Sequence, residues 1–155
     1  MIRQFKFKRR IECGRVLAEL MAEKLDQESR CPELLIPVPL HRNRYTQRGY
    51  NQAEIIATIL ARKMNCKIDL NVCQRIVHTT AQWNLTAPQR RKNVKNAFVL
   101  NKPIQANSVT IVDDVVTTGA TVNELAKLLK SSGVTNIQVW SLARAAHKTP
   151  TTEKS

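Results

Sequence analysis

One segment constrains the fold more than any other: residues 109–121 read VTIVDDVVTTGAT. A compact β-branched strand is followed by two acids, a turn that contains threonines and a glycine, and the start of an apolar-periodic helix. Strands that alternate with helices along a chain build a mostly parallel sheet flanked by helices. In such sheets, ligands bind where the carboxyl ends of the strands meet. We therefore expect an α/β fold with a ligand site at this segment.

The rest of the chain alternates in the same way. Asn51 is a suitable N-cap for one helix, and Gly133 is suited to end another. We expect helices over residues 11–27, 51–64 and 120–131, and strands over residues 33–40, 66–72, 108–112 and 136–143. Residues 113–119 should form a turn, and residues 74–96 a long polar loop of the kind that often serves as a functional lid.

The composition indicates a globular chain. Hydrophobic residues make up 43% of the 155 residues, too many for a disordered protein. We expect residues 1–146 to form a single domain and residues 147–155 a frayed tail. No apolar run approaches the roughly 20 residues that cross a bilayer, and no signal-peptide core follows the basic start. We therefore expect no membrane insertion and a cytoplasmic location.

The charge indicates an anionic partner. Twenty-five Lys and Arg residues against 12 Asp and Glu residues give a formal charge of +13. A field of that sign attracts phosphorylated metabolites, nucleic acid or acidic protein surfaces. The basic residues cluster in residues 3–10, 42–48 and 90–95. For any single cluster, a solvated surface that keeps the protein soluble is the simpler interpretation.

The four cysteines, Cys13, Cys31, Cys66 and Cys73, are scattered, and no pair has the roughly two- to four-residue spacing of a zinc site. We therefore expect no metal site and interpret the cysteines as small core residues. A pairing of Cys66 with Cys73 is the alternative.

The segment with two acids carries groups that suit a phosphosugar. Backbone N–H groups of residues 117–121 would lie beside a helix N-terminus, which favours a phosphate dianion, and Gly119 lets the backbone approach closely. The other phosphate-binding candidates are Thr117, Thr118, Ala120 and Thr121. Asp113 and Asp114 could accept hydrogen bonds from two vicinal sugar hydroxyls. The alternative is a strand, turn and helix whose acids merely favour the helix start.

Two common nucleotide motifs are excluded at this position. No lysine follows Gly119, as a P-loop requires, and three glycines at dinucleotide-binding spacing are missing. The sequence therefore gives no support to ATP hydrolysis or nicotinamide chemistry.

Residues 109–121 resemble the motif of type I phosphoribosyltransferases that binds 5-phosphoribosyl 1-diphosphate (PRPP). The resemblance implies that Asp113 and Asp114 hold the ribose hydroxyls and form the catalytic pair. It also implies that residues 117–121 hold the 5′-phosphate and that Mg²⁺ accompanies PRPP.

A second segment narrows the family. Residues 36–52 read IPVPLHRNRYTQRGYNQ and are similar to the hallmark of the ComF family of competence proteins, a PVPLH run that leads to an RGxNQ box. Further positions of the family pattern are matched by Arg75, Thr80, Gln82, Arg90, Arg91, Asn93, Ala97, Phe98 and Arg144. The resemblance covers residues 2–146. Many ComF proteins begin with a four-cysteine zinc module, which this sequence lacks.

The family resemblance also implies roles for basic residues. The segment 39–52 would contact pyrophosphate, with Arg42, Arg44 and Arg48 as candidate ligands, because an arginine fork binds phosphate oxygens in pairs. Surface arginines on a loop are the alternative. Gly49, Asn51 and Gln52 would shape this loop and cap the next helix.

Residues 74–96 occupy the place of the family's catalytic lid. Arg75, Arg90 and Arg91 would then close over the pyrophosphate. Trp83 would anchor this lid or stack on a base.

Two functions follow from the resemblance. The first is a phosphoribosyltransferase-like protein that binds PRPP or a related compound and acts in DNA uptake or in nucleotide metabolism; the acceptor, and whether turnover occurs, stay open. The alternative is a non-catalytic accessory factor of the transformation machinery that binds single-stranded DNA or protein, beside a helicase-like partner. The cluster at residues 3–10 suits a DNA backbone, and Trp83, Tyr45 and Tyr50 could supply stacking.

Overall fold

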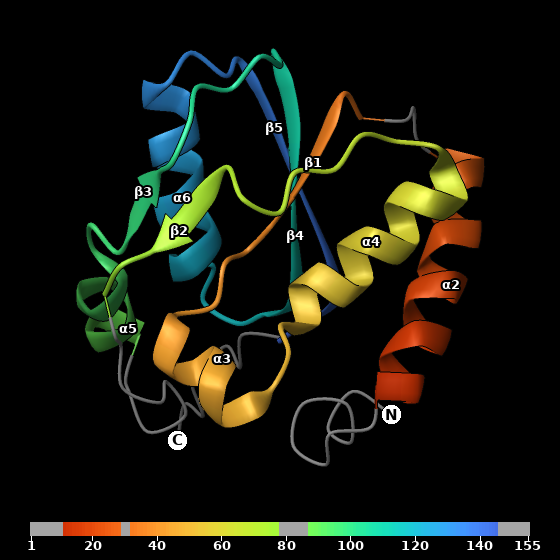
Figure 1. Ribbon diagram of the computed structural model, residues 1–155, viewed down its shortest axis with the longest axis horizontal. Helices are drawn as coiled ribbons and strands as arrows, with labels where there is room; N and C mark the ends of the chain where they lie inside the picture. The colour runs from red at the N-terminus through yellow and green to blue at the C-terminus, as the bar shows by residue number, and fades with distance from the viewer. Residues whose placement is uncertain (1–10, 29–31, 78–86, 146–155) are drawn as a thin grey trace, which may run out of the picture.

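The computed structural model describes residues 11–28, 32–77 and 87–145. Its centre is a parallel sheet in the order β1-β4-β5 (Figure 1). The three strands are β1 (Leu34–Pro37), β4 (Ser108–Val116) and β5 (Asn136–Arg144). Leu34 lies opposite Val109, and Val109 lies opposite Ile137. Because the strands are parallel, their carboxyl ends meet at one edge of the sheet.

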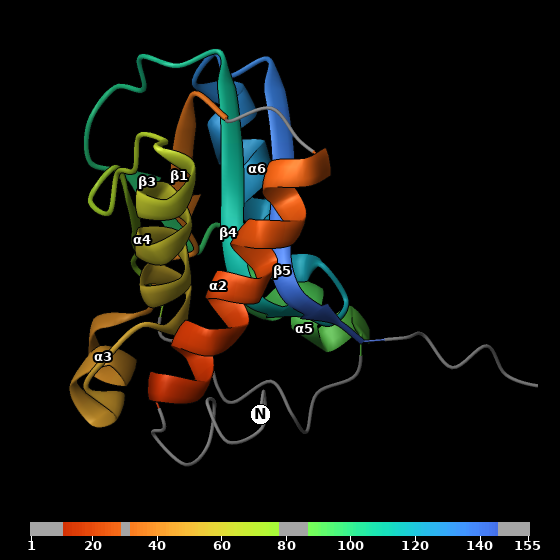
Figure 2. The same cartoon turned by 90° about the vertical axis from the view of Figure 1, so that its right-hand side faces the viewer.

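Helices cover both faces of this sheet, as Figures 1 and 2 show. One face carries α2 (Ile11–Glu28) and α4 (Gln52–Met64), and the other carries α6 (Ala120–Ser131). Alternate residues of β4 face the two cores: Val109 and Ile111 pack with the apolar face of α6, and Val112 packs with that of α4. The expected α/β fold, a mostly parallel sheet flanked by helices, is confirmed.

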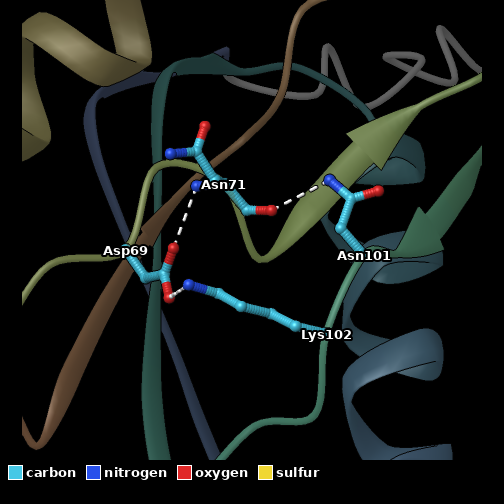
Figure 3. A network of polar contacts seen from close by, with 4 residues as sticks. All are labelled: Asp69, Asn71, Asn101 and Lys102. Atoms are coloured by element: carbon cyan, nitrogen blue, oxygen red, sulfur yellow. Dashed lines mark hydrogen bonds and ion pairs between the residues drawn. The ribbon is translucent and has the colours of Figure 1, made fainter.

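A second, antiparallel sheet lies beside α6 and consists of β2 (Cys73–Arg75) and β3 (Phe98–Leu100). A polar network ties it to the central sheet (Figure 3). Lys102 Nζ lies 2.7 Å from Asp69 Oδ2, and Asn101 Nδ2 donates to the Asn71 carbonyl at 2.9 Å. The Asp69 N–H in turn donates to the carbonyl of Leu35 in β1 at 3.0 Å.

The expected strand over residues 66–72 is wrong. Only a single bridge forms there, between Ile68 and Leu35. Asp69 instead accepts a hydrogen bond from the Asn71 N–H at 2.9 Å, a local turn that competes with strand pairing. The strand begins only at Cys73, and its partner β3 was not expected.

Other expected boundaries shift. The strand expected over residues 33–40 is limited to β1, whereas β4 extends to Val116 because Val115 and Val116 continue to pair with β5. The expected loops contain two short helices, α3 (Arg42–Arg48) and α5 (Ala87–Val94). The three long helices begin and end within one residue of the expected positions, and Asn51 caps α4 as expected.

The cysteines do not all act as core thiols. Cys73 is buried, and burial together with the nearby Asp69 charge raises the pKa of its thiol to about 12. Cys66 is disulfide-bonded, which corrects the expectation of a core thiol at that position. Cys73 is a free thiol, so the alternative pairing of Cys66 with Cys73 is wrong. Within the described residues, no helix has the length and apolar character to cross a membrane.

Candidate phosphosugar site

The two acids lie inside β4, at its carboxyl end, rather than in the following turn. Both are half-buried. The Asp114 N–H donates to Asp113 Oδ1 at 2.9 Å, and the Val115 N–H donates to Asp114 Oδ1 at 2.8 Å. Asp113 has the same strand parity as Val109 and Ile111, so it belongs to the α6 face of the sheet. The two carboxylates are thus held by backbone donors at a fixed edge of the sheet.

The turn after β4 leads directly into α6. Gly119 is the N-cap residue, with φ 75° and ψ 0°, and no side chain caps the helix. The Ala120 N–H makes a long hydrogen bond to Thr118 Oγ1, at 3.4 Å. The first-turn amides of a helix lack partners within the helix, and they carry the positive end of its dipole. This turn brings Thr117, Thr118, Gly119, Ala120 and Thr121 together beside the acids, in an arrangement that suits an anion.

Two of the three arginines of α3 are partly enclosed. Arg42 is exposed, whereas Arg44 and Arg48 are half-buried. Burial and the nearby Arg48 charge lower the pKa of Arg44. The helix follows β1, which is parallel to β4, so α3 lies at the same edge of the sheet as the acids (Figure 1). Crowded like charges of this kind favour binding of an anion.

Gln52 was expected only to shape the loop and cap the next helix, but its side chain also contacts an arginine of the candidate site. Its side chain is 3% exposed, and its Oε1 accepts a hydrogen bond from Arg48 Nη1 at 3.0 Å. Arginine can only donate, so this contact fixes the orientation of the amide. Among the described residues, no acceptor lies within reach of Gln52 Nε2. The place of Gln52 directly after the Asn51 cap was the available sequence signal.

Arg75, the first of the lid candidates, lies in a strand. It ends β2, is 7% exposed, and its guanidinium packs 5.5 Å from the ring centroid of Phe98. Burial and the Arg44 charge lower the pKa of Arg75 to about 10, while the Asp113 charge opposes that shift. The structure thus places Arg75 near the start of the segment 74–96, where the charges of Asp113 and of Arg44 in α3 act on it.

The other two lid candidates, Arg90 and Arg91, lie at the far end of the segment 74–96. Arg90 and Arg91 belong to α5, but their side chains lie outside the described residues, as do Trp83 and residues 3–10. The helix α5 packs against α6, and the Asn96 N–H that follows it donates to Glu124 Oε1 of α6 at 2.8 Å. This end of the segment is therefore fixed next to the helix that begins at the phosphate loop.

Among the described residues of the site, Asp113 and Asp114 supply the carboxylates. Within the described ranges, no group of three or more His, Cys, Asp or Glu side chains is placed to hold a metal ion. Mg²⁺, however, is commonly held by one or two carboxylates together with phosphates of the substrate. Asp113 and Asp114 fit that mode.

Comparisons with known proteins identify relatives. The family model "Phosphoribosyl transferase domain" matches residues 50–155. Competence protein F of Haemophilus influenzae is 42% identical over 153 residues, covering 94% of this chain and 67% of that protein. DNA utilization protein YhgH of Escherichia coli is 39% identical over 149 residues, covering 93% of this chain and 66% of that protein. Competence protein ComFC of Streptococcus pneumoniae is 26% identical, covering 91% of this chain and 60% of that protein.

Solved structures show the same fold. A purine phosphoribosyltransferase of Pyrococcus horikoshii superposes with a TM-score of 0.50 and 23% identity, covering 83% of this chain and 70% of that one. A hypoxanthine phosphoribosyltransferase of Staphylococcus aureus superposes with a TM-score of 0.51 and 13% identity, covering 89% of this chain and 66% of that one. The chain spans about two thirds of the length of its first curated relatives. It belongs to the phosphoribosyl transferase domain family, and within it to the group that contains competence protein F, ComFC and YhgH.

Proposed function

We propose that the chain binds PRPP or a related ribose 5-phosphate compound at the end of β4. One observation carries the proposal: an ordered acid pair at a sheet edge is followed by a left-handed glycine at the N-terminus of α6. The acids and the loop would bind different parts of one ligand. Asp113 and Asp114 accept hydrogen bonds from the sugar hydroxyls, and residues 117–121 donate to the 5′-phosphate.

The arginines of α3 lie at the same edge of the sheet as the acid pair and would bind a second anionic group of the ligand. Arg44 and Arg48 would bind a diphosphate on the anomeric carbon, with Gln52 as a neutral donor beside them. When bound, Mg²⁺ neutralises charge on that diphosphate, and Asp113 and Asp114 are the protein carboxylates that would hold the ion, directly or through water.

The reaction that such a site supports is displacement of pyrophosphate. The bond from the anomeric carbon to the diphosphate breaks, its electron pair leaves with pyrophosphate, and a nucleophile bonds to the same carbon. Positive charge that develops on the sugar is stabilised by the Asp113 and Asp114 carboxylates, and negative charge on the leaving group by Arg44 and Arg48. The identity of the acceptor is not part of the proposal.

The names of the relatives suggest a cellular role. Because relatives are called competence and DNA utilization proteins, we place this ribose-phosphate activity in DNA uptake or in the nucleotide metabolism that follows it. A cytoplasmic location and a helicase-like partner are parts of this proposal.

Calorimetric titration of PRPP with Mg²⁺ tests the site. Wild type should bind, and a variant with Asp113→Asn and Asp114→Asn should lose at least about tenfold in affinity, equivalent to ~1.4 kcal/mol. A matched control with Glu19→Gln and Glu23→Gln removes the same charge from α2 and should bind like wild type. Equal binding by all three proteins would refute the acid-pair assignment, and no binding to wild type would refute the proposed function.

A second candidate function is binding of single-stranded DNA. The helices α3 and α5 contain arginine or lysine and no acidic residue, and both lie at the end of the molecule where β4 ends (Figures 1 and 2). Binding of a strand through several such residues should weaken steeply with salt, whereas binding of a single phosphosugar should respond less. Titration of a fluorescent oligonucleotide at two salt concentrations separates the two candidates. Absence of binding at low salt would exclude direct DNA binding.

A further inference from the structure

The β2–β3 sheet is held at both ends. At one end, the network of Asp69, Lys102, Asn71 and Asn101 joins it to the edge of the central sheet (Figure 3). At the other end, Asn96 is joined to α6 through Glu124. A residue of β2 therefore has a fixed position relative to β4 and α6.

Arg75 is the charged residue on this fixed sheet. It pairs in register with Phe98, and its guanidinium lies over the Phe98 ring, so that both backbone and side chain are held. Cation–π packing of a buried guanidinium leaves its orientation defined. The Phe98 ring belongs to the core beneath α6, the same face of the sheet to which Asp113 belongs by strand parity.

The charges of two groups of the candidate site act on Arg75 with opposite signs. Arg44 of α3 repels it, and Asp113 of β4 attracts it. The guanidinium thus lies within electrostatic reach of both the carboxylate proposed for the sugar hydroxyls and the arginine proposed for the diphosphate. A ligand that carries both groups must bring phosphate charge close to the Asp113 carboxylate, which like-charge repulsion opposes.

We propose that Arg75 is a positioning residue that offsets the charge of Asp113 from within the protein and thereby sets the preference of the site for a sugar with a second anionic group. This inference rests on the proposed function. It differs from closure of a lid, because Arg75 acts from a fixed strand and through Asp113. Its effect should appear in the ratio of affinities for PRPP and ribose 5-phosphate, since only PRPP carries the diphosphate.

The test compares three variants by calorimetry with Mg²⁺. Arg75→Gln removes the charge, Arg75→Lys keeps it, and Phe98→Leu removes the ring beneath it without changing the charge. Arg75→Gln should weaken PRPP binding about tenfold, equivalent to ~1.4 kcal/mol, and ribose 5-phosphate binding less than about threefold. Arg75→Lys and Phe98→Leu should keep the wild-type ratio, even where urea denaturation shows that they are less stable.

The outcomes separate this inference from the proposed function. Equal weakening of both ligands by Arg75→Gln, or the same change of ratio in Phe98→Leu, would show a structural role and overturn the inference. If wild type binds neither sugar, inorganic pyrophosphate serves as the probe. Binding of pyrophosphate that falls about tenfold in Arg75→Gln but not in Arg75→Lys would support the role of Arg75 while the proposed function fails. No binding of pyrophosphate would overturn both.

Discussion

Substitution of Gly119 by alanine should damage the phosphate loop through its backbone alone. A Cβ at this position would meet Asn123 Nδ2 at 3.6 Å and Val122 Cγ2 at 3.9 Å, which are ordinary contacts. The cost therefore comes from φ 75°, a left-handed conformation that is unfavourable by about 1–2 kcal/mol for an L-residue. Loss of unfolded-state freedom returns about 0.4–1 kcal/mol. We expect Gly119→Ala to lower the free energy of unfolding by about 1 kcal/mol, and the affinity for PRPP at least about tenfold.

Gly133 provides the matched control. It follows the end of α6 with φ 100°, and a Cβ there would meet no atom within 4 Å. Gly133→Ala should lose a similar free energy of unfolding and keep the wild-type affinity. Gly119→Asn should be closer to wild type in stability, because asparagine tolerates the left-handed region. Urea denaturation followed by tryptophan fluorescence, together with calorimetry, measures both quantities.

Two results would contradict this reasoning. If Gly119→Ala unfolds at the same urea concentration as wild type, the backbone at this position does not require glycine. If both alanine variants lose stability equally and Gly119→Ala still binds PRPP like wild type, this loop does not hold the phosphate.

Three further substitutions or treatments test other parts of the structure. Burial alone would raise the pKa of Asp69, but the Lys102 contact and the backbone hydrogen bonds from Asn71 and Val72 lower it. Asp69→Asn should therefore lower the free energy of unfolding by up to about 1 kcal/mol above pH ~4. That difference from wild type should disappear as the pH falls through the lowered pKa; a difference that persists at pH ~2 in urea denaturation would contradict it. The Cys73 thiol of the folded protein should react with iodoacetamide at pH 8 at least about 100-fold more slowly than in urea, because burial keeps the thiol protonated. Labelling of the folded protein at a faster rate, measured by mass spectrometry, would contradict this expectation. Gln52→Leu removes the acceptor of the Arg48 Nη1 hydrogen bond together with a donor that has no acceptor among the described residues. The urea midpoint should therefore fall only slightly, but pyrophosphate binding should weaken. Unchanged affinity would show that Gln52 does not face the anion.

The parts of the fold that could be predicted depend on local signals. The helix α4 begins at an asparagine whose Oδ1 accepts the Ala53 N–H at 3.0 Å, a contact between near neighbours in the sequence. The helix α6 follows from its apolar periodicity and from the glycine before it. Such signals are complete within a few residues, so the sequence alone is enough to interpret them.

The parts that could not be predicted depend on pairing between distant segments. Phe98–Leu100 becomes a strand only because it pairs with Cys73–Arg75. The extension of β4 past Asp114 depends on β5, where Val115 lies opposite Ala143 and Val116 opposite Arg144. From the sequence alone, Val115 and Val116 could equally belong to a turn, because strand formation depends on context more than helix formation does.

In the candidate site, too, some residues could be predicted from local signals and others depend on pairing between distant segments. The residues of the acid pair and the phosphate loop are contiguous, so a motif could predict them as a set. Arg75 was assigned to a lid by its order along the chain, but its environment is set by the pairing of β2 with β3 and by the parity of β4, which directs Asp113 toward the same face. A buried guanidinium beside a carboxylate and a second arginine is stable only if the opposing charges balance. An incoming anion at α3 would improve that balance, so the residue that sequence order assigns to a moving lid is better suited to fix the charge of the site before the ligand arrives.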